Sequence, residues 1–73
     1  MNNQDTATLS AEEYADQVIE AFDPEWHGTA DHIDYVTDEV VAHIARTAGI
    51  EKRNVNRDSV RTMVESRVAA ARR

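Results

Sequence analysis

Apolar side chains recur at helical spacing in three segments of this chain, and this periodicity is the feature that most restricts its fold. Tyr14, Val18 and Phe22 are four residues apart, and the same interval separates the valines of the last segment. The other two stripes are Ile33, Val36, Val40 and Ile44, and Val60, Val64 and Val68. Side chains at such spacing share one face of an α-helix, so each segment is predicted to bury one face against the others.

Capping signals give the expected boundaries of these helices. Ser10 followed by Glu13 has the form of a capping box, and proline after Asp23 disfavours helical geometry there. Gly49 is typical of a helix C-terminus, and Asn56 is a favourable N-cap. We therefore predict a small all-α domain with three helices over about residues 11–22, 30–48 and 56–71 and a short turn around 24–28. Residues 1–8 are expected to form a flexible tail before a single domain over 9–73.

Length and composition exclude several classes of protein. A chain of 73 residues allows one small domain, and the absence of cysteine excludes a disulfide framework. Neither a signal peptide nor a membrane span is expected, so we predict a cytoplasmic, intracellular protein without membrane association. No nucleophile lies beside a base, and no phosphate-binding loop or paired metal ligands occur. We therefore expect no enzymatic activity, no cofactor and no metal site.

Charge is segregated along the chain. Residues 1–45 contain eleven of the fourteen carboxylates and no lysine or arginine, whereas residues 46–73 contain all eight basic side chains and three acids. Two interpretations are open. The halves neutralise each other inside the fold, or at least one charged face is presented to a partner of opposite sign.

The acids of the first two helices are predicted to form outward faces that bind a protein with a basic surface. Carboxylates one helical turn apart are spaced roughly as phosphates are along a nucleic-acid strand. In size and charge the chain resembles small acidic inhibitors of phages and mobile elements, including many anti-CRISPR proteins. The resemblance implies a DNA-mimic inhibitor of a nucleic-acid-handling protein. The predicted partner-binding residues are Glu12, Glu13, Asp16, Glu20, Asp31, Asp34, Tyr35 and Asp38.

The segment over residues 44–57 resembles the helix-turn-helix family of DNA-binding proteins. The resemblance rests on Ala45 four residues before Gly49 and on Val55 five residues after Ile50. It implies a DNA-binding regulator, although Asp58 stands where the family has an apolar residue. The residues that this alternative assigns to nucleic-acid binding are Lys52, Arg53, Asn56, Arg57 and Arg61.

A structural homodimer is the third possibility. Arg57, Arg61 and Arg67 lie next to the apolar stripe of the last helix, from where their guanidinium groups can reach carboxylates of a neighbouring helix. The neighbour can belong to the same chain or to a second copy.

Two further residue types have an open role. Trp26 is expected to close one end of the core, with an exposed anchor for a partner as the alternative. His32 and His43 are three turns apart and cannot share a metal ion, so no metal site is expected at the histidines. The three histidines are instead expected to lie at the surface.

Overall fold

The computed structural model describes residues 10–71, and this part of the chain is helical without a strand. The α-helices are α2 over Ala11–Glu20, α3 over Ala30–Ala48 and α4 over Arg57–Ala71. Short 3-10 helices occupy the connections, η1 over Pro24–Trp26 and η2 over Lys52–Asn54. The predicted all-α, three-helix fold is confirmed. The predicted tail over residues 1–8 lies outside the described residues.

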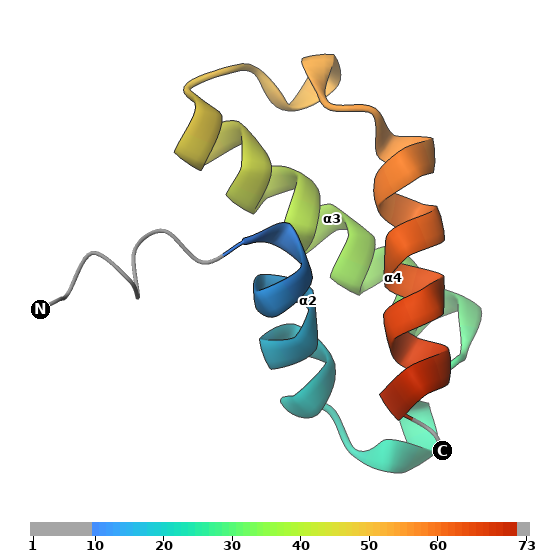
Figure 1. Ribbon diagram of the computed structural model, residues 1–73. Coiled ribbons are helices and arrows are strands. Elements are labelled where there is room, and N and C mark those ends of the chain that lie inside the picture. The colour runs from blue at the N-terminus through green and yellow to red at the C-terminus, as the bar shows by residue number, and fades with distance from the viewer. Residues whose placement is uncertain (1–9, 72–73) are drawn as a thin grey trace, which may run out of the picture.

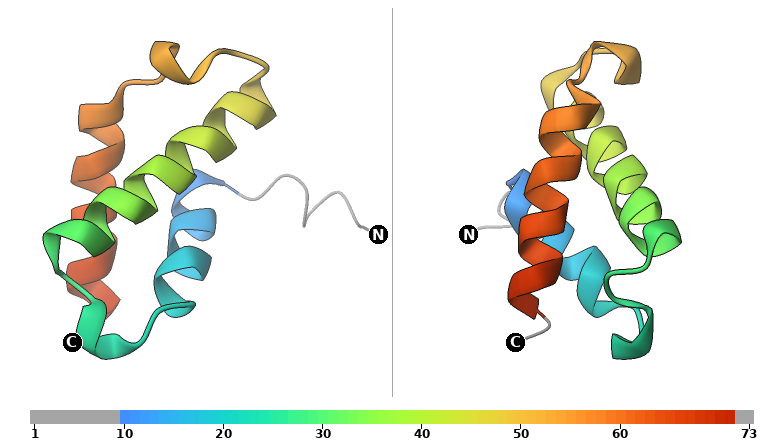
Figure 2. Two further views of the ribbon diagram at one scale, coloured as in Figure 1. Left: turned by 180° about the vertical axis from the view of Figure 1, so that it is seen from behind. Right: turned by 90° about the vertical axis from the view of Figure 1, so that its right-hand side faces the viewer.

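The three α-helices form two layers. α2 and α4 lie side by side, and the longer α3 crosses behind both of them, as the front and side views show (Figures 1 and 2). Each of the three helices packs against the other two. α3 runs in the direction opposite to α4, and the first half of α3 crosses the first half of α4 (Figure 1).

The predicted caps are present. The Ser10 hydroxyl accepts a hydrogen bond from the Glu13 amide at 3.2 Å, and the Glu13 carboxylate accepts one from the Ser10 amide at 3.0 Å. Thr29 caps α3, and the Asn56 side chain accepts a hydrogen bond from the Ser59 amide at 3.1 Å. Each of these bonds satisfies an amide that the first helical turn leaves without a partner. The predicted starts of all three helices are confirmed.

α2 ends earlier than predicted. The helix stops at Glu20 rather than at residue 22, and the amides of Ala21 and Phe22 bond to carbonyls three residues before them. Asp23 is already extended, and Pro24 starts η1. The last turn tightens because the residue before a proline is driven out of helical geometry, which shortens the helix by two residues.

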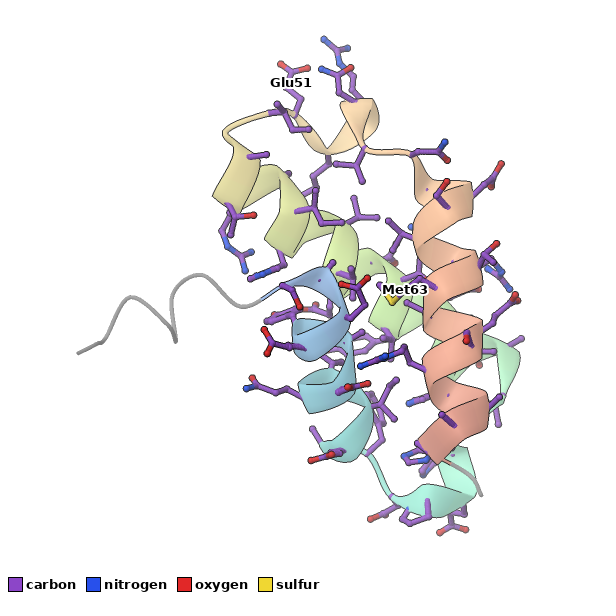
Figure 3. All side chains as sticks on the ribbon, in the orientation of Figure 1. Glu51 and Met63 are labelled. Carbon is purple, nitrogen blue, oxygen red and sulfur yellow. The ribbon has the colours of Figure 1, made fainter. Side chains whose placement is uncertain are left out.

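The core consists of small and β-branched aliphatic side chains. Its most buried members are Ala15, Val36, Val40 and Val64, none of which is exposed to solvent. Met63 of α4 points towards the space between the helices (Figure 3) and packs against this core. The remaining buried aliphatic residues are Ile19, Val41, Ala45, Val60 and Val68.

The buried face of α2 agrees only in part with the predicted one. Ala15 and Ile19 form its centre, whereas Tyr14, Val18 and Phe22 are only partly buried beside it. Tyr14 and Val18 still pack against the core, so the predicted stripe lies on the packed side of the helix but not at its centre. Phe22 is partly buried and is not a member of this core cluster.

Within the described residues, no helix combines the length and the apolar character needed to cross a membrane.

Gly49 is the position where backbone geometry most clearly requires glycine. It ends α3 in the left-handed region with φ +70°, and the Ile50 amide bonds back to the Ala45 carbonyl at 3.0 Å. No atom lies within 4 Å of where its Cβ would be, so a substitution is opposed by backbone strain alone. We predict that Gly49→Ala lowers the free energy of unfolding by about 1 kcal/mol in urea denaturation.

Gly49→Asn is the matched control, because asparagine tolerates left-handed geometry better than alanine does. Its loss of stability should be the smaller of the two. Equal losses, or an unchanged stability of Gly49→Ala, would contradict the assignment of the cost to backbone strain.

Candidate binding face

Three arginines of α4 pair with three aspartates of the acidic half of the same chain. Arg67 donates two hydrogen bonds to Asp16 of α2, from Nε to Oδ1 at 3.0 Å and from Nη2 to Oδ2 at 2.5 Å. Arg57 and Arg61 each donate one to an aspartate of α3, to Asp38 and Asp34 respectively. Neutralisation of one half of the chain by the other thus occurs inside the fold.

The two pairs between α3 and α4 follow from the antiparallel packing of these helices. Asp34 and Asp38 are one turn apart, and their partners Arg61 and Arg57 are one turn apart in the reverse direction. The arginines lie beside the buried valines, so their stems cover apolar surface while the guanidinium groups reach the neighbouring helix. The aspartate side chains of the three pairs remain between 42% and 63% exposed. Solvent therefore screens the pairs, and we assign them a role in orientation and charge balance rather than in overall stability.

The pairing is reflected in the arginines themselves. The hydrogen bond to Asp16 raises the pKa of Arg67, and the hydrogen bond to Asp34 raises the pKa of Arg61. Both guanidinium groups thus remain charged at every physiological pH.

The predicted partner-binding residues divide into two groups. Asp16, Asp34 and Asp38 are engaged with arginines of their own chain, and the Glu13 carboxylate is engaged in the N-terminal cap of α2. The others are exposed and form no ion pair among the described residues. This second group consists of Glu12, Glu20, Asp31 and Tyr35.

Two hollows meet near the end of α2. One, of about 530 Å³, is lined by Phe22, Trp26, Asp31, His32 and Tyr35. The other, of about 460 Å³, follows the groove between α2 and α3 and shares Phe22 and Tyr35 with the first. Its remaining lining residues are Tyr14, Gln17, Val18, Ala21 and Glu39. Phe22 and Tyr35, whose rings contact each other, thus stand between two adjoining hollows, which we treat together as one depression.

We define the acidic aromatic face as this depression with the carboxylates around it. Trp26 is 53% exposed and Tyr35 is 49% exposed, which are large fractions for side chains of this size. Phe22 contacts Tyr35 edge to face, with ring centroids 5.3 Å apart. Asp31 and Glu39 line the two hollows together with the aromatic residues Phe22, Trp26 and Tyr35. We include in the face the exposed carboxylates of the chain segment that carries Phe22 and Trp26, which are Glu20, Asp23 and Glu25. Within the described residues, none of these carboxylates pairs with a lysine or arginine.

The structure corrects the expectation for Trp26. Its ring does not close the core, because the buried valines, isoleucine and alanines already fill the space between the helices. Pro24 starts η1 directly after α2, and this short turn holds Trp26 at the surface. Trp26 is exposed, as the alternative of an anchor for a partner requires, and the anchor role itself stays a prediction.

Two histidines are buried, contrary to the expectation that they lie at the surface. His32 is 3% exposed and His43 is 6% exposed. The His43 ring stacks on Tyr14 with centroids 4.2 Å apart, so the pair fills a gap between α2 and α3. Sequence periodicity did not reveal this burial, because histidine is polar and is not counted in an apolar stripe.

His27 and His32 connect η1 to both neighbouring helices. His27 Nε2 donates a hydrogen bond to the Ile19 carbonyl at 3.0 Å, which satisfies a carbonyl in the last turn of α2. The His27 ring stacks on His32 with centroids 5.1 Å apart, and Phe22 contacts His32 edge to face at 4.8 Å. Both ring nitrogens of His32 are buried without a hydrogen-bond partner among the described residues. Burial, together with the nearby His27, lowers the pKa of His32.

The basic segment departs from the helix-turn-helix pattern. Residues 49–56 separate α3 from α4, whereas that motif has a turn of about three or four residues. Lys52 and Arg53 lie in η2, and Asn56 is used as the cap of α4. Arg53 pairs with Glu51, and Arg57 and Arg61 pair with α3. The structure does not bring these five residues together on one exposed recognition helix.

Within residues 10–71, no group of three histidine, cysteine or acidic residues is placed to hold a metal ion. Comparison with protein-family models, curated proteins and solved structures gave no match to this chain. The fold and the face therefore define a class only, a small helical protein with one exposed acidic and aromatic surface.

The buried state of His32 predicts how stability depends on pH. Its folded-state pKa lies below the unfolded value of about 6.5, so the unfolded chain binds the proton more tightly. Its contribution to stability is complete above pH 6.5 and is lost as the pH falls through the folded-state pKa. Urea unfolding between pH 8 and pH 5.5 should therefore show decreasing stability, and His32→Leu should reduce that decrease. An equally steep decrease in the variant would contradict this account.

Proposed function

We propose that this protein is a non-enzymatic, helical interaction protein that binds a partner with a basic surface through the acidic aromatic face. The observation that carries the proposal is the distribution of its carboxylates. Those facing α4 are balanced by arginines of the same chain, whereas those around Phe22, Trp26 and Tyr35 pair with no lysine or arginine among residues 10–71.

The chemistry of the face supports a protein as the partner. Tryptophan and tyrosine supply large contact areas at low entropic cost, and they are enriched among the residues that dominate binding energy. The surrounding acids attract a basic surface and steer its approach. The predicted residues Glu20, Asp31 and Tyr35 belong to this face. Glu12 lies outside it, about two helical turns before Glu20 on α2. The proposal assigns Asp16, Asp34 and Asp38 to the internal pairs instead.

An inhibitor of a nucleic-acid-handling protein remains the proposed biological role. The support is the resemblance in size and acidity to small inhibitors of phages and mobile elements, which include anti-CRISPR proteins. The paired aspartates interrupt the rows of carboxylates that would imitate a phosphate backbone. The proposed mode of binding is therefore an aromatic anchor flanked by acids rather than an extended DNA mimic.

The alternatives have weaker support. A DNA-binding regulator would use Arg57 and Arg61, whose guanidinium groups already bind aspartates of α3. A homodimer that joins opposite halves of two chains would use these arginines and aspartates to pair across the two copies. The same side chains already pair with each other within a single chain.

The decisive experiment is a capture assay with two variants of equal net charge. The face variant carries Glu20→Lys, Glu25→Lys and Asp31→Lys. The control variant carries the same change at Glu51, Asp58 and Glu65, the three acids outside the first half of the chain. Glu51 points outwards at the end of the molecule opposite η1 (Figure 3). Circular dichroism first establishes that both variants are folded.

We predict that the wild type and the control variant retain the same basic proteins from a host lysate. The face variant should retain at most one tenth of the amount that the control variant retains. The loss is expected because reversal places like charges opposite each other across the interface. An equal loss of binding in both variants would show that net charge alone governs binding. Retention by the face variant at the wild-type level would contradict the proposal.

A further inference from the structure

The hollow beside η1 combines three features that occur together at no other described site of this chain. Phe22, Trp26 and Tyr35 supply aromatic rings, and Asp31 supplies an exposed carboxylate at its edge. The fifth lining residue, His32, is 97% buried with both ring nitrogens lacking hydrogen-bond partners among residues 10–71. Buried polar atoms without partners are rare in folded proteins, and they require an explanation.

A cation is the ligand that the rings and the carboxylate favour. The faces of tryptophan and tyrosine attract a positively charged group by their quadrupoles, and a carboxylate beside them adds direct charge attraction. The N-terminus of α3 opposes a cation weakly through its dipole, but Asp31 lies in that first turn. The carbonyl end of α2, whose last turn has no basic residue, adds attraction from the other side.

His32 restricts the kind of cation. A neutral imidazole has one nitrogen that accepts a hydrogen bond, so a cation with N–H donors satisfies it, whereas a quaternary ammonium group cannot. The nitrogens are covered by the packed rings, and Phe22, which contacts His32 edge to face, also lines the hollow. A shift of the Phe22 ring would therefore uncover the imidazole to a donor that enters the hollow.

We propose that this hollow binds the guanidinium group of an arginine side chain that projects from a basic protein partner. Guanidinium is planar and weakly hydrated, it stacks on aromatic rings, and it carries five N–H donors in a fork that fits a carboxylate. Trp26 and Tyr35 stack on the group, Asp31 accepts its hydrogen bonds, and His32 accepts one more at the base. This inference deepens the proposed function and rests on it for the source of the arginine, but the pocket itself is tested separately.

The test uses acetyl-arginine-amide as the probe, with acetyl-citrulline-amide as its uncharged isostere. Trp26 is the sole tryptophan of the chain, so its fluorescence reports on this hollow alone. Titration at constant ionic strength, followed by fluorescence and by amide chemical shifts, should show saturable millimolar binding of the arginine probe. Citrulline should bind at least five times more weakly.

A matched pair of variants locates the binding. Asp31→Asn should weaken binding of the arginine probe at least threefold. Asp58→Asn removes an acid from the equivalent position in the first turn of α4 and should leave binding unchanged. Trp26→Ala, followed by amide shifts, should abolish saturation. Equal binding of citrulline and arginine, no saturable response, or equal effects of the two aspartate variants would overturn the inference.

The outcomes separate this inference from the proposed function. If the arginine probe fails while the face variant still loses its basic partners, the pocket is refuted and the binding face stands. If the probe binds but capture does not distinguish the face variant from the control, the face is refuted and the pocket stands. Concentration-dependent dimerisation that Asp31→Asn abolishes would place the arginine on a second copy and would overturn its assignment to a separate partner.

Discussion

The structure depends on the requirement that three short amphipathic helices hide their apolar faces on one another. Each helix alone has too little surface to bury, so stability comes from shared packing. Ala15, Ile19 and the valines of α3 and α4 fill the common core. The rings of His32 and His43 are also buried, whereas Phe22 is only partly buried and Trp26 and Tyr35 are exposed.

The same packing sorts the charges. Arginines beside the valine stripe of α4 reach Asp16, Asp34 and Asp38 across the two helix contacts, and this removes much of the opposite charge from those surfaces. The carboxylates around η1 face no arginine among the described residues. Among residues 10–71, carboxylates without an arginine partner thus lie beside exposed aromatic side chains, and we propose that this combination holds a basic partner.

The sequence predicted the fold well and the site only in part. Helical periodicity and the caps at Ser10 and Asn56 act locally, so the starts of the helices could be predicted directly. The centre of the buried face of α2 could not, because Tyr14 and Ile19 are both apolar and only packing selects between them. The sequence did indicate that Arg57, Arg61 and Arg67 reach carboxylates of a neighbouring helix, but it did not name Asp16, Asp34 and Asp38 as their partners. The burial of His32 was equally invisible, since it depends on how η1 folds over the start of α3.

The central claim is that Trp26 is exposed within a field of unbalanced negative charge. Collisional quenching of its fluorescence by caesium and by iodide tests both parts at once, with N-acetyl-tryptophanamide as the reference and equal ionic strength throughout. The account predicts that both ions reach the ring and that caesium quenches it more efficiently than iodide relative to the reference. Protection from both ions would place Trp26 in the core, and stronger quenching by iodide would show that positive charge surrounds it. Either result would contradict the account.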